Sequence, residues 1–246
     1  MGNGLTLGLM LSLALFSMLV YGFLGGRRDA DATRKQTHLL LGAGDFLVHW
    51  FMWVVGPIER LALRCGLTPE VFNFAGLALG LLSGIAIGMG HVEFGGWAIA
   101  LGGIADILDG RIARARGLAS DYGAFIDSTL DRFVEVFVFL GFCVYLGRFQ
   151  GGAFAASAAI TGSLLVSYTR ARGESVGVKY TGGLMQRAER LALTCLVCLA
   201  DRPLASIFGW EEGRAILVVV SAIALLTFVT ATQRTIWIAR ALLRSN

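Results

Sequence analysis

The sequence contains little proline, charge or histidine. Only three of its 246 residues are proline and only three are histidine. No proline-rich linker therefore divides the chain, and the scattered histidines do not form a metal-binding motif. Charged residues make up 15% of the chain, against about 25% in an average soluble domain. This shortage of charge argues against an ordinary soluble protein.

The net charge of +4 does not indicate a nucleic-acid-binding protein. The basic residues gather between hydrophobic segments rather than along one amphipathic face. We therefore expect no nucleic-acid partner. The four cysteines, Cys65, Cys143, Cys195 and Cys198, lie in or beside apolar stretches, so we expect inert thiols rather than a disulfide or a metal site.

Apolar residues are abundant, at 56% of the chain, and they occur in long runs. A run of about 20 residues is long enough to cross the hydrocarbon core of a bilayer. The sequence predicts an all-α integral membrane protein with seven spans, over residues 4–25, 69–89, 94–116, 121–147, 152–176, 184–200 and 214–240.

These runs suggest three parts. The first run lacks the positive leading region of a signal peptide, so we expect residues 1–37 to hold an extra N-terminal transmembrane helix and a basic loop. Residues 38–66 mix apolar and charged residues and predict an amphipathic helix in the membrane interface. Residues 67–246 hold the other six runs and predict a six-helix membrane domain, whose catalytic role is inferred from the motif below.

Basic residues flank alternate ends of the predicted spans. Cytoplasmic loops carry an excess of Lys and Arg, which predicts an outside amino terminus and a cytoplasmic carboxyl terminus. The cell (inner) membrane is the expected location. The basic groups on the predicted cytoplasmic side are Arg27, Arg28, Arg34 and Lys35; Arg111, Arg114 and Arg116; Arg170, Arg172, Lys179, Arg187 and Arg190; and Arg234, Arg240 and Arg244.

Acidic residues lie within the third and fourth predicted spans. An aspartate at the centre of a membrane helix costs about 2.5–3.5 kcal/mol, so these carboxylates require compensation. Asp106 and Asp109 share one helix face, and Asp127 and Asp131 share another because they are four residues apart. Two divalent cations would neutralise them, and all-oxygen ligands favour Mg²⁺ or Mn²⁺.

Two alternative roles for these acids stay open. They could form structural ion pairs with Arg111, Arg114, Arg116 and Arg132, or they could form the ion site of a non-enzymatic membrane ion or lipid carrier. Ion pairs do not account for the spacing, and the chain shows no duplicated half of the kind many transporters have.

The acids belong to a longer motif. Asp106-Ile-Leu-Asp109-Gly110-Arg-Ile-Ala113-Arg114 is followed after eight residues by Gly123, then at intervals of four by Asp127 and Asp131. This pattern resembles the complete signature of the CDP-alcohol phosphatidyltransferases.

The resemblance implies a fold, metal ions and site residues. It implies a six-helix bundle, usually a homodimer, with a cavity open to the cytoplasm and two metal ions per site. Asp106, Asp109, Asp127 and Asp131 would bind the metal, and Asp131 would also be the catalytic base. The nucleotide side of the site would contain Gly110, Ala113, Arg114 and Gly123.

A second segment bears on the acceptor. Ser167-Tyr168-Thr169-Arg170-Ala171-Arg172 and Arg187-Ala188-Glu189-Arg190 resemble the acceptor segments of phosphatidylinositol phosphate synthases, with Ala188 in place of a proline. Arginine forks bind phosphate oxygens. Arg170, Arg172, Arg187 and Arg190 are the candidate acceptor-phosphate ligands; anchoring of helix ends on the positive side is the alternative.

We therefore expect an enzyme that moves a phosphatidyl group from CDP-diacylglycerol to a phosphorylated alcohol, inositol phosphate before glycerol phosphate, with release of CMP. Free inositol, an amino-alcohol acceptor, or transfer from a soluble CDP-alcohol to diacylglycerol are alternatives. Glu135, one turn beyond Asp131, has two open roles: it tunes the base by like-charge repulsion, or it packs against a later span.

Overall fold

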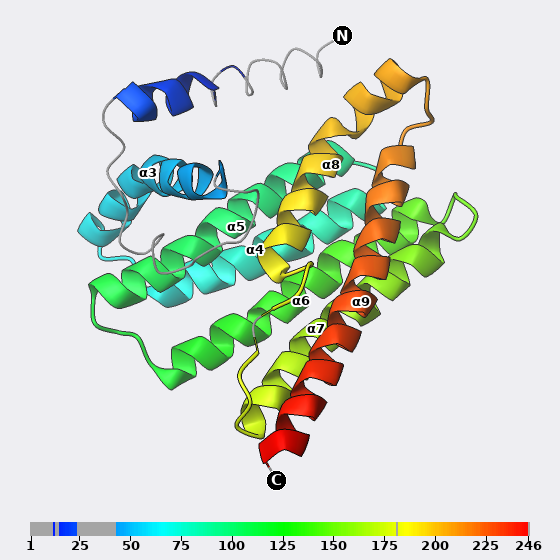
Figure 1. Cartoon of the computed structure of the whole chain (residues 1–246). Coiled ribbons are helices and arrows are strands. Elements are labelled where there is room, and N and C mark those ends of the chain that lie inside the picture. Colours follow the sequence, from blue (N-terminus) through cyan, green and yellow to red (C-terminus); the bar gives the residue numbers. More distant parts are fainter. Residues whose placement is uncertain (1–11, 13–14, 24–42, 181, 246) are drawn as a thin grey trace. The chain divides into compact units, whose positions relative to one another are not determined.

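The computed structural model describes residues 12, 15–23, 43–180 and 182–245. Within these ranges all regular secondary structure is helical (Figure 1). The labelled helices are α3 (Ala43–Arg64), α4 (Pro69–Gly88), α5 (Val92–Ala115), α6 (Asp121–Leu146), α7 (Gly152–Ser175), α8 (Arg187–Phe208) and α9 (Arg214–Ser245).

Most predicted spans agree with these helices to within a few residues. α4 begins at Pro69, a position that suits proline because the first turn of a helix needs no backbone N–H donor. The predicted first span, residues 4–25, lies largely outside the described residues, although residues 15–23 are helical. The roles predicted for residues 1–37 and 38–66 therefore remain predictions.

α8 differs most from the prediction. It begins at Arg187 because Gln186 and Glu189 form a capping box, in which the backbone N–H of Gln186 donates to Glu189 Oε2 at 2.9 Å. It continues through Pro203 and ends at Phe208, followed by the C-cap Gly209, whose φ of 66° is left-handed. The predicted span ends at residue 200 because the charged Asp201 and Arg202 follow it, whereas the helix continues past both.

Five of the described helices are long and apolar enough to cross a membrane: those spanning Phe46–Arg64, Pro69–Gly88, Gly152–Ser175, Arg187–Phe208 and Arg214–Arg244. α5 and α6 are equally long but carry the charged motif. These helices confirm the prediction of an all-α integral membrane protein.

The contacts divide the chain into two units. The first unit comprises the described residues within Met1–Phe72 and Asp106–Ala119, and the second comprises those within Asn73–Ala105 and Ser120–Asn246. In the first unit, α3 bonds to the last part of α5: Arg111 Nε donates to Glu59 Oε2 at 2.7 Å. Arg116 donates to the carbonyl oxygens of Leu63 and Gly66, which satisfies acceptors at the end of α3.

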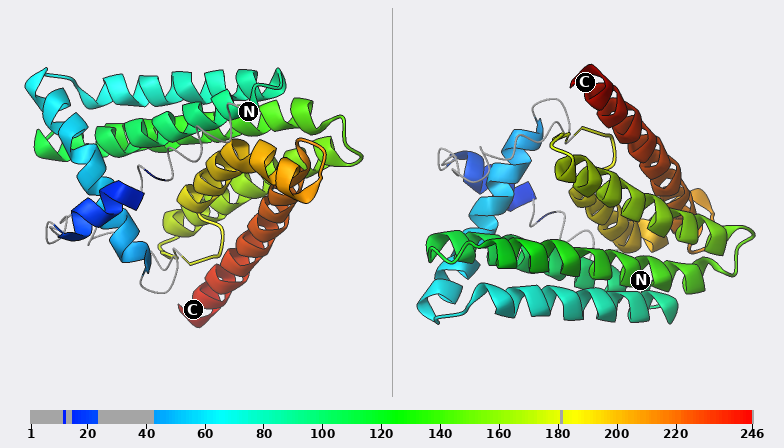
Figure 2. Two further views of the ribbon diagram at one scale, coloured as in Figure 1. Left: turned by 90° about the horizontal axis from the view of Figure 1, so that it is seen from above. Right: turned by 90° about the horizontal axis from the view of Figure 1, so that it is seen from below.

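In the second unit, α7 packs against both α6 and α9, and α8 packs against α9 (Figures 1 and 2). Glycine lets α4 and α6 approach closely, as in many membrane bundles. A Cβ added to Gly84 would lie 2.2 Å from the carbonyl oxygen of Phe137, and one added to Gly141 would lie 2.3 Å from that of Gly84. The two backbones therefore touch directly.

The apolar core of the second unit lies toward one end of its helices. On α6 the fully buried apolar residues begin only at Val138 and continue through Phe139 and Phe142 to Leu146. Asp127 and Asp131 lie on the preceding turns of the same helix. α6 thus joins an apolar half to a polar half, and the polar half carries the predicted site.

Candidate functional site

Asp106 and Asp109 lie in the first unit, on the last turns of α5. They are three residues apart and so share a helix face. Asp109 is buried, at 5% exposure, and Asp106 is half-buried. The Arg114 side chain lies beside Gly110, because a Cβ on Gly110 would be 3.2 Å from Arg114 Nη1. The predicted nucleotide-binding residues Gly110 and Arg114 are therefore neighbours.

Local signals fix the ends of the two helices that carry the motif. α5 ends in a Schellman arrangement: Leu118 N donates to Ala113 O at 2.8 Å, and Gly117, with a φ of 66°, donates to Arg114 O. α6 begins at its N-cap Ser120, whose Oγ accepts from Gly123 N at 3.1 Å. Gly123 thus has a capping role in addition to its predicted place beside the nucleotide.

Asp127 and Asp131 lie in the second unit, on successive turns of α6. Asp131 Oδ1 is 2.5 Å from Arg187 Nη2, and the two side chains are 15% and 22% exposed. The structure thus brings together the predicted base and one of the predicted acceptor ligands, which are 56 residues apart in the sequence (187 − 131).

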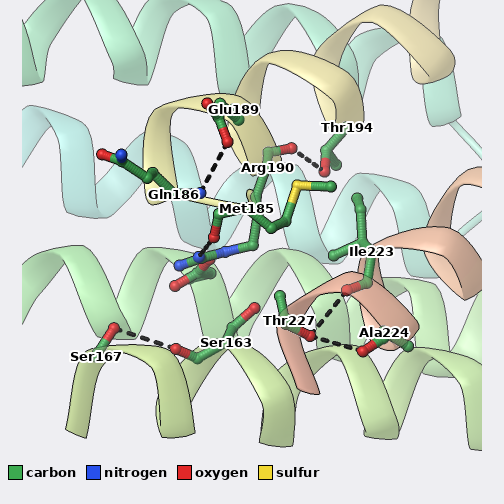
Figure 3. A network of polar contacts seen from close by, with 11 residues as sticks. Ser163, Ser167, Met185, Gln186, Glu189, Arg190, Thr194, Ile223, Ala224 and Thr227 are labelled. Carbon is green, nitrogen blue, oxygen red and sulfur yellow. Dashed lines mark hydrogen bonds and ion pairs between the residues drawn. The ribbon is translucent and has the colours of Figure 1, made fainter. Parts of the chain in front are cut away.

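One turn further along both helices, Glu135 pairs with Arg190. Both side chains are almost completely buried. Arg190 also donates from Nη1 to the carbonyl oxygen of Met185 at 2.8 Å (Figure 3). Glu135 therefore meets a positive charge on α8, which agrees with its predicted packing against a later span.

Arg170 and Arg172 have partners on their own helix. Arg170 Nε is 3.0 Å from Glu174 Oε1 in an exposed pair, and Arg172 Nη1 donates to Ser175 Oγ at 3.3 Å. The structure therefore sorts the four predicted acceptor arginines into an exposed pair on α7 and a more buried pair on α8.

Two further arginines lie among these groups, and the sequence predicted a site role for neither. Arg234 on α9 is buried at 4% exposure and donates to the carbonyl oxygens of Gly182 and Val166, both at 2.9 Å. It thus ties α9 to α7 and to the α7–α8 connection. Arg132 on α6 interacts electrostatically with Asp131 and Glu135. Arg132 thus fits the alternative of ion pairing among the acids, whereas no local motif marks Arg234, whose partners lie on other segments.

Comparison with known proteins gives the family. The family model described as CDP-alcohol phosphatidyltransferase matches residues 67–242. The phosphatidylinositol phosphate synthase of Mycobacteroides abscessus is 33% identical over 191 residues, covering 75% of this chain and 83% of the relative. The archaetidylinositol phosphate synthase of Methanothermobacter thermautotrophicus is 32% identical over 181 residues, covering 74% and 88%.

A solved structure of a relative agrees with these sequence comparisons. The phosphatidylinositol phosphate synthase of Mycobacterium tuberculosis with bound CDP-DAG matches with a TM-score of 0.67 and 29% identity, over 75% of this chain and 93% of that one. The same protein has been solved with manganese and citrate. On the extent of the family match, this chain belongs to the CDP-alcohol phosphatidyltransferase family.

Proposed function

We propose that this enzyme transfers a phosphatidyl group from CDP-diacylglycerol to a hydroxyl of inositol phosphate and releases CMP. The observation that carries the proposal is the complete aspartate motif, from Asp106 to Asp131, inside the region matched by the family model. Relatives at 32–33% identity are named as synthases of inositol-phosphate lipids.

The four aspartates suit two Mg²⁺ or Mn²⁺ ions. Carboxylate oxygens are the ligands these hard cations prefer. The sequence motif makes Asp106, Asp109 and Asp127 the proposed ligands together with Asp131, and the M. tuberculosis relative was solved with manganese. Bound ions would supply positive charge against the diphosphate oxygens.

The side chains would perform the remaining steps. The acceptor oxygen attacks the phosphorus that bears diacylglycerol, and the bond from that phosphorus to the CMP oxygen breaks. Asp131 takes the hydroxyl proton as a general base, a role worth about 10²–10⁴-fold in rate. Arg114, exposed at the end of α5 beside Gly110, would bind the diphosphate, and Ala113 and Gly123 leave room near the nucleotide.

The acceptor phosphate would be bound by arginines. The ion pair of Arg187 with Asp131 supports this role, because a phosphate held by Arg187 would bring its hydroxyl close to the base. Arg170, Arg172 and Arg190 complete the proposed set. Glycerol phosphate offers the same charged group and is the main competitor.

We further propose that the active site faces the cytoplasm and that the enzyme is a homodimer in the cell membrane. The arrangement of basic residues supports the orientation. The interfacial position of α3 and the role of the first helix as an added span belong to the same proposal.

The test is an acceptor panel. Purified enzyme in lipid vesicles with CDP-diacylglycerol is given inositol phosphate, glycerol phosphate, free inositol or serine, and the lipid product is identified by mass. We expect CMP release and phosphatidylinositol phosphate only with Mg²⁺ or Mn²⁺ present, and loss of both after chelation.

Three other results would each indicate a different function. A glycerol phosphate product would change the acceptor but keep the family chemistry. Labelled CDP-choline incorporated into diacylglycerol would reverse the donor. Ion flux without CMP would indicate a carrier.

A further inference from the structure

Glu135 and Arg190 form a charged pair inside the second unit. Their side chains are 2% and 1% exposed, and Arg190 Nε donates to Glu135 Oε1. Neither residue is a metal ligand in the family motif. The proposed chemistry gives Arg190 a role toward the acceptor phosphate but leaves open why Glu135 is buried beside it.

The pair is the second of two ion pairs that join α6 to α8. Asp131 and Glu135 are four residues apart on α6, and Arg187 and Arg190 are three apart on α8, so each couple shares a helix face. Asp131 meets Arg187, and Glu135 meets Arg190. The buried pair is thus adjacent to the proposed base and the proposed acceptor ligand.

Stability alone is a weak reason for such a pair. Replacing a buried ion pair by apolar residues of similar size is often neutral or stabilising, because both charges lose their hydration. A buried pair can instead hold one particular geometry, and the contacts of Arg190 indicate which geometry is held.

Arg190 anchors the start of α8. Its Nη1 donates to the carbonyl oxygen of Met185, just before the helix, at 2.8 Å, and its own carbonyl accepts from Thr194 Oγ1 at 2.7 Å (Figure 3). Arg187 belongs to this same turn. The position of the Arg190 side chain therefore affects the position of Arg187.

The pair also has polar atoms that could form further hydrogen bonds. Glu135 Oε2 and Arg190 Nη2 are buried without a hydrogen-bond partner among the described residues, and so is Arg132 Nη1. Buried polar atoms normally have partners. Arg132 interacts electrostatically with both members of the pair, so the surplus charge here is positive and suits a bound anion.

We infer that Glu135 is a positioning residue of the acceptor site: through Arg190 it holds the first turn of α8, so that Arg187 faces Asp131. The inference rests on the proposed function. It assigns to Glu135 no contact with the nucleotide or the metal.

The test is the kinetics of Glu135→Gln with inositol phosphate as the varied acceptor. Loss of one charged hydrogen bond predicts an acceptor KM about tenfold higher, with kcat and the KM for CDP-diacylglycerol within about twofold of the wild type. In an Arg190→Gln background the added Glu135→Gln change should raise the acceptor KM no further, because residues that act through one another are not additive.

Asp201→Asn is the matched control, since Asp201 is a carboxylate buried at the other end of α8. An equal rise of the acceptor KM in this control, or an unchanged acceptor KM in Glu135→Gln, would overturn the inference. If Glu135→Gln does not fold, Glu135→Asp replaces it; a raised acceptor KM supports the inference and a wild-type value overturns it. Absence of transfer to inositol phosphate in the wild-type enzyme would refute the proposed function instead.

Discussion

Glu135 and Asp201 are both buried carboxylates of the second unit, but they have different kinds of partner. Glu135 meets the side chain of Arg190. Asp201 accepts from the backbone N–H of Gly213 at 2.7 Å, just before α9 begins. Near this second carboxylate, Arg148 donates to the hydroxyl of Tyr145 and to the carbonyl oxygen of Glu212.

The difference separates a structural end of α8 from the end that holds the proposed acceptor site. A backbone N–H has a fixed place in the fold, so the bond from Gly213 to Asp201 stabilises the turn between α8 and α9. A guanidinium can rotate toward another anion. Under the proposed function, Arg187 can therefore leave Asp131 and bind the phosphate of the acceptor. We therefore expect changes at the polar end to alter kinetics and changes elsewhere to alter stability, and three substitutions test this division.

Asp131→Asn should have the largest effect. Loss of the base is expected to lower kcat by about 10²–10⁴-fold, measured as CMP release. The free energy of unfolding should fall by less than about 1 kcal/mol, because the pair with Arg187 is partly exposed. A variant that retains wild-type kcat would contradict the assignment of the base.

Gly84→Ala should come next and should act on stability. A methyl group there would collide with the carbonyl oxygen of Phe137, and overpacking of this kind costs about 1–3 kcal/mol. Thermal unfolding in detergent measures it. Gly103→Ala is the control, because nothing lies within 4 Å of an added Cβ there. Equal melting temperatures for the two variants would contradict the close helix contact.

Asp201→Asn should have the smallest effect. The amide oxygen can still accept from Gly213, so the loss is that of a weakened cap, about 0.5–2 kcal/mol in unfolding free energy. The KM values for both substrates should not change. A change in either KM would show that the two ends of α8 are coupled and would contradict the division between a structural end and an end that holds the proposed acceptor site.

The helices and the motif could be predicted from the sequence because both are local patterns. Apolar runs placed five of the predicted spans to within a few residues of α4, α5, α6, α7 and α9 at most boundaries. The aspartate pairs follow from helical spacing alone. The end of α8 was wrong because Pro203 and its charged neighbours look like a helix stop, whereas the helix continues through them.

The side-chain partners could not be predicted. Glu135 and Arg190 are 55 residues apart, and Arg234 reaches carbonyl groups 52 and 68 residues away. Such contacts depend on which helix faces meet, which a single sequence does not reveal. The four arginines proposed as acceptor ligands illustrate this too: their clustering could be seen in the sequence, but their separate partners could not.

The contacts of Gly84 with Phe137 and of Gly141 with Gly84 have a consequence for the register of α4 and α6. Each glycine leaves a notch for the backbone of the opposite helix, so sliding one helix along the other by a single residue would push a side chain into a notch. The position of α6 along its axis is therefore fixed relative to α4. Asp131 lies ten residues before Gly141, about 15 Å along the axis, and so two residues without side chains fix how far the proposed base lies from this contact.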